Sequence, residues 1–203
     1  MRYALLFALL GHLLCGVSDC LLGYSRSGRL DMRKTANPEE MASMFADMPP
    51  AFPAASMLLG TFAIGAFAFG YLALARWMSG FSAAGGAVML AAAVLYPVTI
   101  TAHHVLCGAA EWLYLRLDRT PKAREVALAL MKLGAVPMVA GYLGLLVFTV
   151  TLFVLVVSGR TPLPAWACVA NTLVLLLPLL PTRLPAKGNI AGAAMFLGLL
   201  LLL

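Results

Sequence analysis

Six runs of predominantly apolar residues, each near the length of a membrane-crossing helix, dominate this sequence of 203 residues. A helix needs about 20 apolar residues to cross the hydrocarbon core of a bilayer. Apolar residues make up 63% of the chain and charged residues 11%, whereas a soluble domain is about 45–50% apolar and about 25% charged. A soluble fold of this size has too little interior to bury so much apolar surface. The composition therefore excludes soluble enzymes and nucleic-acid-binding modules.

We expect one all-α transmembrane domain over residues 1–203, an integral membrane bundle of six transmembrane helices. Eleven of the 14 Lys and Arg residues fall in the first, third and fifth loops, and three fall on the other side. Because positively charged loops stay in the cytoplasm, both termini are expected to be non-cytoplasmic. The basic charge is thus a topology signal rather than a sign of nucleic-acid binding. The expected spans are roughly 3–24, 54–78, 84–115, 133–157, 163–180 and 188–203.

The first cytoplasmic loop contains a helix-start pattern. Asn37 is followed by Pro38 and two glutamates, which is typical of an N-cap, a first-turn proline and an acidic first turn. Apolar residues then recur at helical spacing until Pro49. This pattern predicts a short amphipathic helix on the cytoplasmic face. Its apolar residues are Met41, Met44, Phe45 and Met48.

The pattern H-x-L-C-G-x-x-[D/E] occurs twice, 92 residues apart, in the first and third expected spans. The chain has only three histidines and four cysteines, so a chance alignment of two of each is improbable. The offset crosses two spans, so both copies run the same way through the membrane and indicate a duplicated helical hairpin. Positions i, i+3, i+4 and i+7 share one helix face. The two polar stripes are His12, Cys15, Gly16 and Asp19, and His104, Cys107, Gly108 and Glu111.

Ionisable side chains within a membrane span are costly, about 2.5–3.5 kcal/mol on insertion scales, and face the bundle interior or water. We expect the two stripes to lie side by side and to enclose a pocket open toward the cytoplasm. Paired His and carboxyl groups exchange protons, which favours an intramembrane acid/base enzyme acting on a lipid-like or isoprenoid-like small molecule. The candidate catalytic residues are His12, Asp19, His104 and Glu111, and the candidate binding residues are Cys15, Cys107, His103, Tyr71, Tyr96 and Trp112.

Three alternatives stay open at this point. The stripes would serve only as interhelical hydrogen bonds if they met no substrate. A small transporter or proton-coupled channel also uses paired intramembrane acids, although six short spans leave little room for it without a homo-oligomer. His and carboxyl groups are also zinc ligands, so an intramembrane zinc hydrolase is a further alternative. Its ligands would be His12, His104, Asp19 and Glu111.

The run from Cys15 to Tyr24 reads C-G-V-S-D-C-L-L-G-Y. It resembles the first-helix signature, C-G-x-x-D-x-L-L-G-[Y/W], of a family of uncharacterised bacterial multi-span membrane proteins. The likeness extends to Met57-Leu-Leu-Gly60 in the second span and the histidine of the third. It implies a multi-pass protein of the bacterial cytoplasmic (inner) membrane, surrounded by membrane lipid, and it brings no established chemistry.

Overall fold

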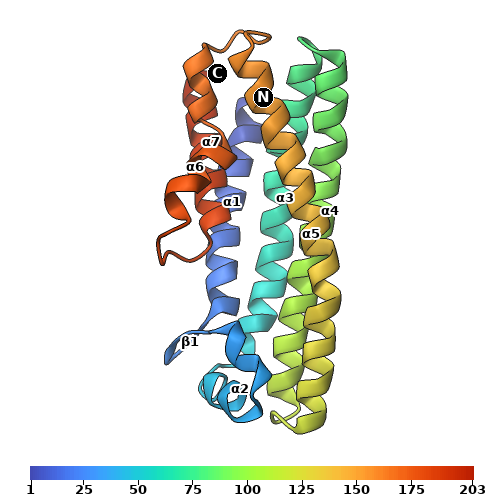
Figure 1. Cartoon of the computed structure of the whole chain (residues 1–203), viewed down its shortest axis with the longest axis vertical. Helices are drawn as coiled ribbons and strands as arrows, with labels where there is room; N and C mark the ends of the chain where they lie inside the picture. The colour runs from blue at the N-terminus through green and yellow to red at the C-terminus, as the bar shows by residue number, and fades with distance from the viewer.

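Four long helices form the body of the molecule and are long and apolar enough to cross a membrane (Figure 1). The computed structural model describes all 203 residues. The all-α prediction is confirmed, and three of these helices match the expected spans to within three residues. The helices are α1 (Arg2–Gly23), α3 (Ala51–Ser79), α4 (Ala83–Arg116) and α5 (Pro121–Val157).

Helix α5 begins 12 residues before its expected span. Thr120 caps it by accepting a hydrogen bond from the main-chain nitrogen of Ala123 at 3.2 Å, and Pro121 occupies the first turn. The charged residues that follow interrupt the apolar run but not the helix. Helix α5 therefore continues beyond the apolar segment at its N-terminal end.

Helix α3 lies between α1 and α4. Helix α5 packs along α4, and its C-terminal half also contacts α3, where Phe148 meets Tyr71 with ring centres 4.9 Å apart. Helix α7 (Lys187–Leu202) packs on α1 on the side away from α4. The main apolar core therefore forms where α3 meets its neighbours and contains several aromatic rings. Among its fully buried members are Phe67, Tyr71, Phe148 and Phe196.

The expected fifth span, 163–180, is wrong as a continuous helix. The chain there forms a 3₁₀ helix η2 (Ala165–Val169), a five-residue α6 (Thr172–Leu176) and a second 3₁₀ turn η3 (Leu177–Leu179). Asn171 explains the break, because its side chain accepts from the nitrogen of Leu173 at 3.0 Å and donates to Thr149 O at 2.8 Å. It therefore starts a new helix inside the apolar run. We call residues 165–202, from η2 to the end of α7, the C-terminal hairpin.

The C-terminal hairpin covers α1 only in part. Its turn packs against Gly16, with Ala186 and Asn189 both 3.7 Å from the position of an added Cβ. Gly16 lies seven residues before the end of α1, and the turn also contacts the loop beyond that end, where the main-chain oxygen of Arg183 accepts from Arg29 Nη1 at 3.4 Å. In Figure 1 the hairpin enters and leaves at the upper end of the bundle, where both chain termini lie. The hairpin therefore begins and ends at the same end of the bundle.

The opposite end of the bundle, drawn at the bottom of Figure 1, holds residues 24–50 and the turn between α4 and α5. We call it the basic end, because eight of the 14 Lys and Arg residues lie in or beside these segments. The loop forms strands β1 (Tyr24–Ser25) and β2 (Gly28–Arg29), a 3₁₀ helix η1 (Met32–Ala36) and α2 (Pro38–Met44).

The expected amphipathic helix is confirmed as α2. The side chain of Asn37 accepts from the main-chain nitrogens of Glu39 and Glu40, at 2.8 and 3.2 Å. The apolar face does not lie free on a surface, since Met41 and Phe45 are fully buried. They pack in a second apolar cluster with Ala110 and Tyr114 of α4 and Ala123 and Ala127 of α5.

Candidate functional site

A network of buried polar side chains connects four helices, and Asn189 of α7 stands at its centre. The Asn189 side-chain nitrogen donates to Asp19 Oδ2 at 2.8 Å. Its side-chain oxygen lies 2.9 Å from His12 Nδ1. Beyond His12 the network reaches Tyr71 of α3, and beyond Asp19 it reaches His104 of α4. His12 and Asp19 of the first expected stripe are thereby linked through a helix that carries neither stripe, and His104 is the one residue of the second stripe that joins them through Asp19.

The hydrogen bonds of His12 determine its tautomer. Asp19 accepts from the amide nitrogen of Asn189, so the amide oxygen faces His12 and must accept from Nδ1–H. Nε2 of a neutral His12 is then an acceptor for the hydroxyl of Tyr71 at 3.2 Å. The ring stacks on Phe67 with centroids 4.4 Å apart and lies 5.7 Å from Phe196. Such a closed aromatic environment favours the uncharged imidazole.

His104 is fixed by two serines of neighbouring helices. Its Nε2 lies 3.1 Å from the main-chain oxygen of Ser56, which can only accept, so Nε2 carries a proton. The hydroxyls of Ser18 and Ser56, at 2.9 and 3.1 Å, also contact Nε2. Each hydroxyl donates its proton to the main-chain oxygen of the other serine, at 2.9 and 2.8 Å. The serines thus bind α1 to α3 and orient the imidazole.

Asp19 and His104 face each other across the network. With Nε2 of His104 protonated, the second ring nitrogen, Nδ1, faces Asp19 Oδ1 at 3.7 Å. A proton held between them would give either a carboxylic acid beside a neutral ring or a carboxylate beside an imidazolium. The separation exceeds a hydrogen bond, so transfer between the two requires a small closing movement. The Asp19 side chain is 35% exposed and that of His104 only 7%, so Asp19 is the partner at which a proton can enter.

The network extends over most of a membrane's thickness. Ser56 and Tyr71 lie at its two ends along α3, 15 residues apart. At 1.5 Å per residue this is about 22 Å, compared with about 30 Å for the hydrocarbon core. Asn189 is the one link in the middle that cannot take up or release a proton at ordinary pH. The network therefore consists of two proton-holding halves, Asp19–His104 and His12–Tyr71, joined by an amide.

Two glycines create the room for these histidines. A Cβ at Gly60 of α3 would overlap the ring of His104 and lie 2.8 Å from Ser18 Oγ. A Cβ at Gly192 of α7 would lie 2.5 Å from His12 Cε1. Each glycine thus allows an imidazole to cross a neighbouring helix backbone. Without Gly60, His104 could not reach past α3 toward α1.

The expected side-by-side arrangement of the two stripes is wrong. Helix α3 lies between α1 and α4, and the ring of Phe67 occupies the space beside His12. The two stripes approach each other through Asp19 and His104, where Gly60 of α3 has no side chain to separate them. Phe67 was missing from the expectation because a face count on two helices says nothing about the helix between them.

Four of the other expected site residues lie away from this network. His103 contacts α5, with Nδ1 3.0 Å from the main-chain oxygen of Gly134, and Cys107 Sγ is 3.6 Å from the same ring nitrogen. Trp112 lies under the guanidinium of Arg116, 5.9 Å from its ring centre. Glu111 is buried, and its Oε2 has no hydrogen-bond partner.

The two remaining expected residues lie beside the network. Cys15 is a buried member of the main core, one turn from Asp19. Tyr96 of α4 stacks on Phe67 with ring centres 5.4 Å apart and meets Tyr71 edge-on at 5.3 Å. It therefore supports the aromatic wall around His12. Tyr71 itself belongs to the network through its hydroxyl.

Sequence reasoning missed Asn189, Ser18 and Ser56. Asn189 is the only Asn in the last apolar run, which is a weak signal for an interhelical contact. Ser18 directly precedes Asp19 and occupies one of the unspecified positions of the repeated pattern. Small hydroxyl residues are common in membrane helices, so nothing in the sequence distinguishes these two. Only the packing of α1 on α3 brings them to His104.

No three His, Cys, Asp or Glu side chains are grouped closely enough to hold a metal ion. The four residues expected as zinc ligands divide between the two halves of the network and the isolated Glu111. A zinc ion would need at least three of them around one point. The residues present therefore do not fit a zinc site.

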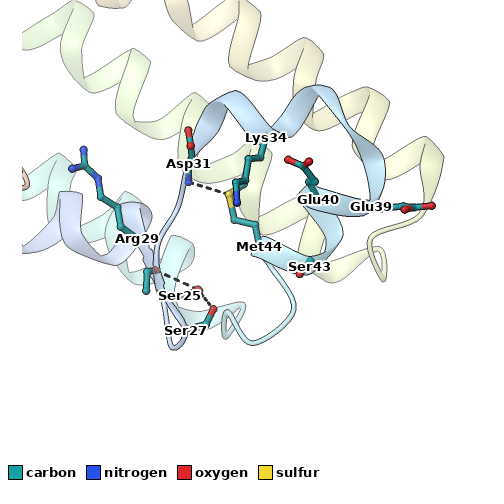
Figure 2. Close-up of a pocket in the computed structure, with 10 residues that line it drawn as sticks. Ser25, Ser27, Arg29, Asp31, Lys34, Glu39, Glu40, Ser43 and Met44 are labelled. Carbon is teal, nitrogen blue, oxygen red and sulfur yellow. Dashed lines mark hydrogen bonds between the residues drawn. The ribbon is translucent and has the colours of Figure 1, made fainter.

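Two surface hollows lie at the basic end, apart from the network. The first, of about 420 Å³, is enclosed by the β1–β2 hairpin, η1 and α2 (Figure 2). Its wall includes the main-chain nitrogen of Asp31, which donates to Met44 Sδ at 3.1 Å. Cations and carboxylates alternate around it, so it presents no single charge. The second lies between η1 and α5.

Comparison with known proteins adds a family. A family model described as "Family of unknown function (DUF6796)" matches residues 1–203, the whole chain. The chain belongs to this family. Membership in DUF6796 agrees with the expected likeness to an uncharacterised family. No curated protein and no solved structure gives a significant match. The chemistry of the network must therefore be argued from its own geometry.

Proposed function

We propose that this chain is a small proton-coupled transporter of the bacterial inner membrane, with the basic end in the cytoplasm. In this proposal Asp19 and His104 take up a proton, and the C-terminal hairpin moves in response. The observation that carries the proposal is the position of Asn189, whose amide binds Asp19 and His12 at once. A change in the charge of Asp19 alters a contact that holds the hairpin in place.

The arrangement of charge supports a cytoplasmic entry for the proton. Positively charged segments stay in the cytoplasm, and the basic end carries most of the Lys and Arg residues. Asp19 lies four residues before the end of α1 on that side. The Asp19 side chain is 35% exposed, so the hairpin leaves it accessible. Broken re-entrant helices of this kind are common at the binding sites of transporters.

The amide of Asn189 also explains why such a protein would not leak protons. An amide transmits a hydrogen bond but does not carry a proton from Asp19 to His12 at ordinary pH. Protonation of the Asp19–His104 half affects the His12–Tyr71 half only through the orientation of Asn189. Coupling of a proton to a movement requires such an interruption, because a continuous titratable chain would conduct.

A pH-dependent distance measurement tests this proposal. Spin labels are attached at Leu184→Cys and Lys122→Cys, and the distance between them is measured in lipid nanodiscs. Leu184 is 45% exposed in the turn of the hairpin, and Lys122 lies at the start of α5. The four native cysteines are replaced by alanine for this purpose. We expect the distance distribution to change with pH, and the change to disappear in Asp19→Asn. Asp47→Asn, which removes an exposed loop carboxylate, should retain it.

A distribution that is independent of pH in the otherwise native protein would contradict the proposal. A pH dependence that survives Asp19→Asn and disappears in Asp47→Asn would contradict it as well, since the loop would then be the sensor. Both outcomes are read from the same labelled pair.

The exposed part of Asp19 favours a second candidate, the intramembrane acid/base enzyme acting on a lipid-like or isoprenoid-like substrate. A carboxyl that is 35% exposed within a membrane helix is accessible to a molecule in the bilayer. His104 would return the proton that Asp19 delivers. An enzyme of this kind would incorporate deuterium from D₂O into a membrane lipid. Lipid extracts of cells that produce the protein, compared with the Asp19→Asn variant by mass spectrometry, would show this enrichment.

A further inference from the structure

We propose that the hollow between η1 and α5 binds the headgroup of an anionic phospholipid. The hollow measures about 690 Å³. Its walls come from Met32 and Thr35 of η1 and from one face of the first four turns of α5, between Arg124 and Ala135. It lies apart from the polar network and takes no part in the proposed proton coupling.

The charge of this hollow is positive and uncompensated. Arg124 and Lys132 line it, and neither forms an ion pair with a carboxylate of the chain. The one acid of the lining, Glu125, is bound by Lys122 at 2.9 Å. Two cations are therefore free to bind an anion, and a phosphate diester supplies one.

Arg124 is held in place before any ligand arrives. Its Nη2 donates to the main-chain oxygens of Thr35 and Ala36, each at 2.7 Å. Its Nε is buried and has no hydrogen-bond partner. The guanidinium is thus fixed between η1 and α5, with part of its donor capacity unused, and ordering it would cost a ligand little entropy.

The other side of the hollow is apolar, which favours a lipid over a soluble anion. Leu128, Met131 and Ala135 follow one another along the lining face of α5. The same face continues toward the middle of the bundle with Val139 and Leu143, which are 53% and 55% exposed. Lys132 directly precedes the apolar run that starts at residue 133. A headgroup at Lys132 would therefore place an acyl chain along these exposed side chains.

Lipid selectivity measured with spin-labelled lipids tests the site. The full chain is reconstituted in phosphatidylcholine vesicles, and the motionally restricted fractions of spin-labelled phosphatidylglycerol and phosphatidylcholine are compared. One basic residue near an anionic headgroup corresponds to about a fivefold preference. We expect Lys132→Gln to lower the preference for phosphatidylglycerol by about this factor, while Arg26→Gln, which removes an exposed cation of the basic end outside the lining, leaves it unchanged.

Two tryptophan variants test the site without changing the net charge of the protein. Ala135→Trp fills the upper part of the hollow, and Leu133→Trp places the same ring at a 62% exposed position beside it. We expect only Ala135→Trp to reduce the preference. Equal binding of both lipids by the unaltered protein would overturn the proposal. Equal losses in Lys132→Gln and Arg26→Gln would overturn it too, because diffuse surface charge would then be the cause.

Discussion

Asn189 donates its side-chain amide to Asp19 over 2.8 Å and thereby ties the C-terminal hairpin to helix α1. Asn189 lies in the first turn of α7, next to the turn of the hairpin. The contact therefore holds the turn of the hairpin against α1. Because the same amide also accepts from His12, one residue couples two ionisable groups on α1. The following predictions test this arrangement and its surroundings.

Asn189→Leu should loosen the hairpin. The variant leaves His12 Nδ1–H and one Asp19 oxygen without their partner, and an unsatisfied buried polar group costs about 1–3 kcal/mol. We expect faster hydrogen exchange of the α7 amides, measured by mass spectrometry in nanodiscs. Ile190→Ala, at the neighbouring 39% exposed position, should exchange like the unaltered protein. Identical exchange in both variants would mean that the amide does not hold the hairpin.

Gly60→Ala should separate His104 from α1. The new Cβ would overlap the imidazole, so the ring must leave Ser18 and Asp19 or push α4 away from α3. Overpacking of this kind costs typically about 1–3 kcal/mol, and we expect a lower thermal unfolding temperature. Gly65→Ala is the matched control on the same helix, since nothing lies within 4 Å of its added Cβ. Equal melting temperatures for the two variants would contradict the close approach of His104.

Asp31 in the basic-end loop should stay ionised to unusually low pH. Its carboxylate accepts from Arg33 Nε at 2.9 Å and Nη2 at 2.8 Å, and these bonds lower its pKa to about 2. Since this pKa is lower in the folded chain than in the unfolded chain, the contact contributes to stability above about pH 4. That contribution is lost as the pH falls toward about 2.

The arginine can be removed to test this assignment. In Arg33→Gln the pKa of Asp31 should return toward its ordinary value of about 3.9. Carbon-detected NMR titration of the Asp31 carboxyl carbon would measure both values. An unchanged titration curve in Arg33→Gln would show that the arginine does not set it.

The elements that the sequence predicts well are those decided by a local pattern. Uninterrupted apolar runs placed α1, α3 and α4 almost to the residue, and Asn37 with its proline and glutamates placed α2. The prediction of a continuous fifth helix is wrong because apolar composition alone does not show where a helix is interrupted. Asn171 capping α6 within that run is a local signal that could have indicated the break.

The candidate site was only partly predictable, because it is made by contacts between distant segments. His12, Asp19 and His104 carry their own signal, as ionisable residues in apolar runs. Their partner Asn189 is 170 residues from Asp19 and belongs to a helix without other polar markers. Glu111 shared the pattern of Asp19, yet its buried Oε2 has no hydrogen-bond partner. Matching patterns on two helices therefore did not produce matching environments.

The central claim is that Asp19 exchanges a proton and that Asn189 senses it. Infrared difference spectroscopy of the protein in lipid, recorded between acidic and alkaline buffer, measures this directly. We predict a carboxylic acid C=O band that titrates, disappears in Asp19→Asn and changes frequency in Asn189→Leu, because the hydrogen bond from the amide is gone. A spectrum in which no titrating carboxyl band depends on Asp19, or in which that band is unaffected by Asn189→Leu, would contradict the account.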